Sequence, residues 1–195
     1  MILFFDTETT GLYPGEICQL TYIMQRKEEV TKKNFFFLVN EMPKVAEAIH
    51  GFSLERLKTL SDGKDFSFHF EEIKKDFESA DLIVSHNFNF DHSFLRESYA
   101  RLGETFTFKE SFCTMKAFVP ICKLTRNSSK GYKYPKLTEL CEFLGVFEEE
   151  INLKTFELFN ENLLSHDARY DTVSLYLAVN KAFNSGYLEE IAKFL

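Results

Sequence analysis

Two acidic residues near the start of the sequence could bind cations together. Asp6 and Glu8 follow the apolar residues 2–5 and are separated by one residue. In a strand the side chains alternate between two faces, so both carboxylates would project the same way, about 7 Å apart along the strand. Two carboxylates on one face repel each other, and burying them is unfavourable. Either this strand end is solvated and the pair has no role, or the pair binds hard divalent ions such as Mg²⁺, which prefer carboxylate oxygens and water.

A second polar group directly follows another apolar segment, residues 82–84. It runs from Ser85 to Asp91 and contains His86 and Asn87. Asp91 falls near the predicted start of a helix, where a carboxylate commonly acts as a cap or a dipole partner. The carboxyl end of a strand in an open α/β sheet is also where ligands tend to bind. His86 and Asn87 could orient their neighbours by hydrogen bonds, although a core position is the simpler interpretation of His86.

The third group, residues 165–171, contains His166, Asp167 and Asp171. Asp171 lies five residues beyond His166, which is more than one helical turn. If a helix begins near Asp167, His166 lies in the loop that enters it and Asp171 lies one turn inside. Such a pair suits a general base beside a metal ligand. Helix capping is the alternative for His166 and Asp167 taken singly.

These groups must be positioned by elements that the apolar pattern predicts. Short apolar runs predict five strands, at residues 2–8, 17–24, 35–39, 82–84 and 111–115, with a charged connector at residues 26–33. Helical spacing and caps predict helices at residues 43–49, after Ser53, and at residues 70–79, 91–102, 137–144 and 167–183. This order predicts a three-layer α/β fold with a mixed five-stranded sheet flanked by helices. No repeat or low-complexity linker divides the sequence, so we expect a single domain spanning residues 1–195.

In order and internal spacing, the three groups resemble the motifs of the DEDDh-type 3′–5′ exonucleases. Asp6-Thr7-Glu8 is similar to the first motif, and it continues into Thr9-Thr10-Gly11-Leu12 as in the proofreading epsilon subunits of bacterial DNA polymerase III. The segment from His86-Asn87 to Phe90-Asp91 is similar to the second motif, and residues 166–171 are similar to the third. Weaker similarities at residues 49–52, 113–114 and 137–145 extend the resemblance over roughly residues 2–183.

The resemblance implies a ribonuclease H-like fold and two-metal hydrolysis of phosphodiester bonds from the 3′ end of a strand, releasing 5′-mononucleotides. Two divalent ions, Mg²⁺ or Mn²⁺, would bind to the acidic positions. These positions are Asp6, Glu8, Asp91 and Asp171. His166 would deprotonate the attacking water. Thr9 and Leu12 would contact the terminal nucleotide, and His50 and Asn87 are further candidates for that contact.

The implied substrate is the 3′ end of DNA, single-stranded or mispaired, in proofreading, repair or end trimming. Oligoribonuclease and ribonuclease T share the same acidic positions, so a 3′–5′ exoribonuclease is the alternative. A DNA polymerase is a candidate partner. The sequence ends soon after the third motif, without the long tail by which epsilon-type subunits attach to a polymerase, so a free-standing exonuclease is an equal expectation.

Residues 123–136 form a basic segment without acidic residues. Its cations are Lys123, Arg126, Lys130, Lys133 and Lys136. Tyr132 and Tyr134 lie among them, and basic groups with aromatic rings are typical of single-stranded nucleic-acid channels. Lys130, Tyr132 and Lys133 are therefore candidates for a nucleic-acid-binding loop. A solvated loop is an equal alternative, because residues 127–129 and Gly131 favour turns.

Composition excludes several classes of protein. The hydrophobic fraction of 45% and the charged fraction of 27% are typical of globular proteins. The apolar start lacks the basic leader of a signal peptide, and no apolar stretch approaches the ~20 residues that cross a membrane. Four cysteines without zinc spacing indicate reduced thiols and a cytoplasmic protein. The net charge of -7 disfavours charge-driven coating of nucleic acid, yet it is compatible with an enzyme that recruits cations.

Two other functions compete with this interpretation. His166-Asp167 is also the dipeptide of HD-type phosphohydrolases, but their fold is helical and the strands predicted here speak against it. A catalytically inactive nuclease-like binding module would usually have lost an acidic position, whereas all five motif positions match here.

Overall fold

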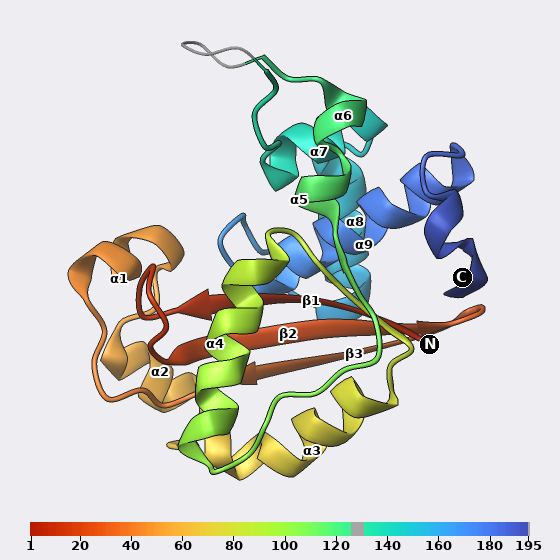
Figure 1. Cartoon of the computed structure of the whole chain (residues 1–195). Coiled ribbons are helices and arrows are strands. Elements are labelled where there is room, and N and C mark those ends of the chain that lie inside the picture. The colour runs from red at the N-terminus through yellow and green to blue at the C-terminus, as the bar shows by residue number, and fades with distance from the viewer. Residues whose placement is uncertain (126–130, 195) are drawn as a thin grey trace.

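A mixed five-stranded sheet forms the centre of the molecule (Figure 1). The computed structural model describes residues 1–125 and 131–194. The strands are β1 (Ile2–Thr9), β2 (Ile17–Arg26), β3 (Glu29–Phe36), β4 (Leu82–Ser85) and β5 (Ser111–Cys113). In the order β3-β2-β1-β4-β5, the first two pairings are antiparallel and the last two parallel. The predicted mixed sheet is confirmed, and it excludes the helical HD-type fold.

Helices cover both faces of this sheet. They are α1 (Lys44–His50), α2 (Leu54–Leu60), α3 (Phe66–Ser79), α4 (Phe88–Arg101), α5 (Thr114–Ala117), α6 (Val119–Cys122), α7 (Leu137–Leu144), α8 (Glu148–Phe159) and α9 (Ala168–Asn184), followed by a 3-10 turn, Glu189–Phe194. Helix α4 crosses one face, with α3 beside it, while α9 packs on β1 and β2 and is covered by α7 and α8 (Figure 1). The predicted three layers are therefore present.

Strand β1 explains on which side of the sheet the acidic pair lies. Ile2 and Phe4 belong to the apolar core shared with α7, α8 and α9. Leu3 and Phe5 belong to the core shared with α3 and α4. Because side chains alternate along a strand, Asp6 and Glu8 continue the Ile2–Phe4 face just beyond its apolar part. Both carboxylates consequently lie on the α9 side.

Strand β3 differs from the prediction. It spans Glu29–Phe36 and pairs with β2 along its whole length, whereas residues 26–33 were expected to form a connector and residues 35–39 the strand. The reason is that β3 is an edge strand whose first half is exposed, so its charged side chains hide the alternation that would mark a strand. A tight turn with Lys27 in the left-handed region (φ 54) joins it to β2.

Helix α8 was not predicted at all, and several boundaries shift. In α8 Ile151 and Thr155 are buried while the apolar Leu153 and Phe156 are exposed, so the sequence shows no clear apolar stripe. Helix α4 begins at Phe88, three residues before the predicted start, and α3 begins at Phe66 rather than at residue 70. Strand β5 ends at Cys113, where α5 begins, instead of continuing to residue 115.

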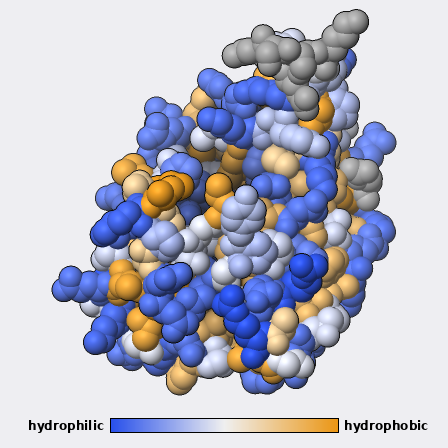
Figure 2. All heavy atoms as spheres, turned by 60° about the vertical axis from the view of Figure 1, so that its left-hand side comes forward, coloured by the Kyte–Doolittle hydropathy of each residue, from blue (hydrophilic) through white to orange (hydrophobic). Residues whose placement is uncertain are grey.

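The surface around α1 and α2 combines hydrophobic and hydrophilic side chains. Figure 2 shows this face with hydrophobic residues dispersed among hydrophilic ones. Leu12 is 79% exposed and Val45 of α1 is 77% exposed. None of the helices in the described part of the chain combines the length and the apolar character needed to cross a membrane.

Candidate active site

Three elements bring the predicted carboxylates together at one end of the sheet. Asp6 and Glu8 lie on β1, Asp91 in the first turn of α4, and Asp171 in the first turn of α9. Because β1 and β4 are parallel and α4 follows β4, the carboxyl end of β1 and the start of α4 lie at the same end of the sheet. Oxygens of Glu8 and Asp171 and a ring nitrogen of His166 all lie within 4.8 Å of one another.

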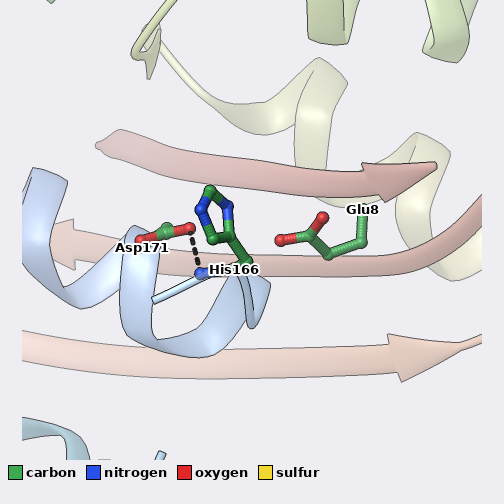
Figure 3. A group of neighbouring side chains, drawn as sticks. All are labelled: Glu8, His166 and Asp171. Carbon is green, nitrogen blue, oxygen red and sulfur yellow. Dashed lines mark hydrogen bonds between the residues drawn. The ribbon is translucent and has the colours of Figure 1, made fainter. Parts of the chain in front are cut away.

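His166 lies in the loop that enters α9, as the sequence predicts. Its backbone is in the left-handed region (φ 66), and its side chain is exposed. Its backbone N–H donates to Oδ2 of Asp171 at 3.0 Å. Figure 3 shows the imidazole ring between the carboxylates of Glu8 and Asp171. The ring is thus next to the acidic group and open to solvent.

Asp91 is buried, and only one of its oxygens is satisfied within the described chain. Thr7 Oγ1 donates to Oδ1 at 2.7 Å, whereas Oδ2 is buried without a hydrogen-bond partner among the described residues. The cap of α4 is Asn87, so Asp91 is not the helix cap. A buried carboxylate oxygen without a donor is unfavourable unless a cation meets it. This oxygen therefore fits a metal site.

Burial raises the pKa of all four carboxyl groups, and mutual repulsion raises it further for Asp6 and Glu8. For Asp6, burial raises the pKa well above its ordinary value, and the charges of Asp91, Asp171 and Glu8 raise it further. Burial, followed by the charge of Asp171, raises the pKa of Glu8 to about 9. Burial also raises the pKa of Asp91 to about 7 and that of Asp171 to about 6.

None of these four carboxylates pairs with a Lys, an Arg or the amino terminus in the described chain. The ion pairs formed by its Lys, Arg and amino-terminal groups all involve other acids. Divalent cations would supply the missing charge, and carboxylate oxygens are the donors that Mg²⁺ and Mn²⁺ prefer. The donor set, the orphaned oxygen and the raised pKa values together fit divalent metal ions.

The predicted nucleotide-binding residues occupy different surroundings. Thr9 is buried and its hydroxyl donates to the carbonyl of Gly11 at 2.8 Å, while Leu12 projects into solvent from the same loop. His50 is buried: its Nδ1 accepts from the N–H of Phe52 at 3.1 Å, so Nε2 carries the hydrogen and donates to the carbonyl of Thr9 at 3.3 Å. His50 thus supports the backbone of Thr9.

Asn87, the fourth nucleotide-binding candidate, begins α4 in the left-handed region (φ 71). It is half-buried and its side chain makes no cap hydrogen bond. The contacts of Thr9, Leu12, His50 and Asn87 with a nucleotide stay predictions.

His86 connects the second motif to the segment before α7 rather than to the acidic group. Its Nε2 donates to the carbonyl of Pro135 at 3.0 Å, and its Nδ1 accepts from the hydroxyl of Thr114 at 2.9 Å. Burial lowers the pKa of His86 to about 4, so the ring is neutral near pH 7. The hydrogen bonds of His86 thus hold Pro135, which lies within the basic segment, rather than a carboxylate of the acidic group.

Only part of the basic segment can be described. Lys130, like Arg126, lies outside the described residues. Lys133 forms an ion pair with Glu139 of α7, and Tyr132 forms a backbone bridge with Thr125 and is partly exposed. The nucleic-acid contacts of Lys130, Tyr132 and Lys133 stay predictions.

Comparison with known proteins identifies the family. Residues 3–172 match the family model of the RNase T exonucleases, and this chain belongs to that family. Its members are hydrolases of phosphodiester bonds and depend on metal ions. A DNA polymerase III subunit epsilon-like protein of Rhodobacter capsulatus is 31% identical over 109 residues, covering 52% of this chain and 15% of that protein. This chain therefore spans only a small part of that relative.

Two solved structures show the same fold. Exonuclease X in complex with 5′ overhanging duplex DNA superposes with a TM-score of 0.60 and 18% identity, covering 95% of this chain and 93% of that one. Exonuclease I of E. coli in complex with a dT13 oligonucleotide gives a TM-score of 0.70 and 17% identity, covering 99% of this chain and 42% of that one. The ribonuclease H-like exonuclease fold is thereby confirmed.

Proposed function

We propose that this protein is a metal-dependent 3′–5′ exonuclease that shortens DNA from its 3′ end and releases 5′-mononucleotides. The observation that carries the proposal is the convergence of four carboxylates and His166 at one end of the sheet, without a Lys or Arg partner among the described residues. Support for DNA comes from the epsilon-like relative and from the DNA complexes of exonucleases X and I.

Each residue of the site has a proposed task. Two ions, Mg²⁺ or Mn²⁺, would be held by Asp6, Glu8, Asp91 and Asp171. When bound, such ions stabilise the negative charge that develops on the attacking and leaving oxygens. His166, exposed beside Glu8 and Asp171, would accept the proton of the attacking water. Thr9 and Leu12 would hold the terminal nucleotide.

Digestion of 5′-labelled oligonucleotides tests this function. Single-stranded, paired and mispaired DNA, with RNA of the same sequence, would be incubated with Mg²⁺ or Mn²⁺ and separately with excess EDTA. We expect a ladder that shortens from the 3′ end with metal and no shortening with EDTA, and a 3′-blocked oligonucleotide serves as the control. Undiminished hydrolysis in EDTA would contradict metal dependence. Faster digestion of RNA would favour the exoribonuclease alternative, and preference for mispaired ends would favour proofreading.

A further inference from the structure

The loop that carries His166 packs on the apolar core through the half-buried Leu163, but the residues that follow it up to His166 do not. It joins the end of α8 to the start of α9 and begins at Asn160, which lies in the left-handed region (φ 55). Leu164, Ser165 and His166 are all exposed. A segment with few buried contacts opens easily. Besides Leu163, polar contacts at the two ends of the loop are what hold the His166 ring in place.

Arg169 joins both ends of this loop. The side chain of Arg169 is buried, and its guanidinium lies over the ring of Phe36 at 5.3 Å. Its Nη1 donates to Glu161 at 2.7 Å, where the loop begins. Its Nε and Nη2 donate to the two oxygens of Asp167 at 2.9 and 2.8 Å, directly after His166. A bidentate pair of this kind fixes geometry as well as charge.

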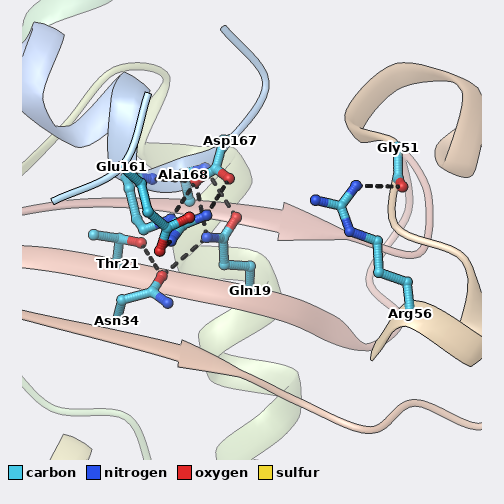
Figure 4. Close-up of polar contacts among 9 residues, drawn as sticks. Gln19, Thr21, Asn34, Gly51, Arg56, Glu161, Asp167 and Ala168 are labelled. Atoms are coloured by element: carbon cyan, nitrogen blue, oxygen red, sulfur yellow. Dashed lines mark hydrogen bonds and ion pairs between the residues drawn. The ribbon is translucent and has the colours of Figure 1, made fainter. Parts of the chain in front are cut away.

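Gln19 connects the same loop to the sheet (Figure 4). It is fully buried on β2; its Nε2 donates to Oδ1 of Asp167 at 3.0 Å and its Oε1 accepts from the N–H of Ala168 at 3.0 Å. Asn34 of β3 orients this amide by accepting from Nε2 at 2.9 Å. Gln19 is also the direct partner of Glu8 in the pairing of β1 with β2, and such partners share a sheet face. One pair of strand residues thus carries both a candidate metal ligand and an anchor of the His166 loop.

We propose that Gln19, Arg169 and Asp167 are positioning residues that hold His166 between Glu8 and Asp171, a role that rests on the proposed exonuclease function. They fix the backbone directly after His166 through Asp167. The hydrogen bond from the backbone N–H of His166 to Asp171 fixes the backbone of His166 itself. A misplacement of about 1 Å at a reacting group can cost roughly 100-fold in rate. Loss of the network should therefore lower turnover by displacing the base, without removing any group that touches the substrate.

A double-mutant cycle separates positioning from general stability. Gln19→Met keeps the length of the side chain and removes both the donor and the acceptor. The matched control is Gln25→Met on the same strand, whose side-chain hydrogen bonds are long, 3.4 Å. We expect Gln19→Met to lower kcat by about 10- to 100-fold with KM nearly unchanged, and the control to retain activity. In the His166→Ala background, Gln19→Met should cost nothing further, because it acts through the missing ring. Equal losses in both backgrounds would overturn the proposal.

A milder variant and a spectroscopic measurement keep the test independent of folding and of activity. Glu161→Gln breaks only the outer ion pair, at a side chain that is 55% exposed; Glu157→Gln, 62% exposed and paired with Lys154, is its control. We expect a smaller loss of kcat for Glu161→Gln alone. Among the five histidines, the ring signals of His166 in NMR spectra should shift in Gln19→Met and Glu161→Gln, and stay unchanged in both controls. An unchanged His166 signal would overturn the positioning role. A wild-type protein without nuclease activity would contradict the proposed function, and the NMR comparison would still decide whether the network places His166.

Discussion

The start of α9 carries two carboxylates with different surroundings: Asp167, which caps the helix, and Asp171 in its first turn. Asp167 is paired bidentately with Arg169 and also accepts a hydrogen bond from Gln19. Asp171 lies close enough to Asp6 and Glu8 for its charge to raise the pKa of both. Neither these three nor Asp91 pairs with a Lys or Arg in the described chain. A buried charge is tolerated when it is matched. The Asp167 cluster is therefore complete within the protein, whereas the acidic group needs ions from outside.

Asp91→Asn should have the largest effect on activity and an opposite effect on stability. The change removes the charge of one proposed metal ligand, so exonuclease activity should be abolished. The amide oxygen can still accept the hydrogen bond from Thr7, so the local structure should be kept. The melting temperature of the metal-free protein should rise, by roughly 2–4 °C for each kcal/mol of relieved repulsion. Activity assays and thermal melts in EDTA and in Mn²⁺ measure both effects.

Asp65→Asn is the matched control for this change. Asp65 caps α3 away from the acidic group, and Asn caps a helix about as well as Asp, so neither property should change. A metal-free melting temperature of Asp91→Asn at or below that of the wild type would contradict the repulsion among the four carboxylates.

Asp167→Asn should shift stability in the other direction. It leaves the buried Arg169 with Glu161 as its remaining carboxylate partner, and removing one member of a buried ion pair typically costs about 3–5 kcal/mol. For a domain of this size that is a decrease of roughly 6–20 °C in melting temperature. Thermal melts in EDTA would measure it. A higher melting temperature for Asp167→Asn, like the one expected for Asp91→Asn, would contradict the difference between the paired Asp167 and the unpaired acidic group.

The pH dependence of the metal-free protein sharpens the same comparison. The folded-state pKa values of Glu8, Asp91 and Asp171 are raised above their ordinary values, so the folded protein binds more protons than the unfolded chain between about pH 4 and 9. This contribution to stability is therefore fully present below about pH 4 and falls as the pH rises, until it is lost above the raised pKa values of about 6 to 9. Melting temperatures in EDTA should show the loss, which saturating Mn²⁺ should reduce. The same slope with and without metal would argue against ion binding by these groups.

Lys133→Ala should have the smallest effect. Its pair with Glu139 is partly exposed, and such pairs contribute about 1 kcal/mol or less, so the melting temperature should hardly change. If Lys133 contacts the substrate, the salt dependence of single-strand binding should flatten by up to roughly 0.7 log units. Lys193→Ala, which breaks another surface pair, is the control. An unchanged salt dependence would favour the alternative that the basic segment is a solvated loop.

The acidic group could be predicted because its signals are local. Asp6 and Glu8 are two residues apart on one strand, so alternation places both on one face. His166 and Asp171 flank the start of one helix, so they are close in sequence as well. The order of these segments then supplied the resemblance. The predicted ends of strands and starts of helices then placed the three segments at one end of the sheet.

The positioning network could not be predicted in this way. The hydrogen bond from Gln19 to Asp167 joins residues 148 positions apart, and no spacing rule connects them. In the sequence Gln19 is a polar residue within an apolar strand, and Arg169 is a charged residue at the start of a helix. Both are buried because the fold brings β2, β3 and the start of α9 together, which only the three-dimensional structure shows.

The two edges of the sheet also determine how the molecule behaves toward its own copies. An unpaired strand edge offers backbone donors and acceptors to any other extended chain. Edge strand β3 carries exposed Lys32 and also Lys33, which is held by Glu72 and Asp76 of α3 at 2.7 and 2.6 Å. The opposite edge, β5, is only three residues long. Charge on one edge and brevity on the other oppose the addition of a sixth strand, so the charged residues that hide β3 in the sequence also protect the protein against aggregation.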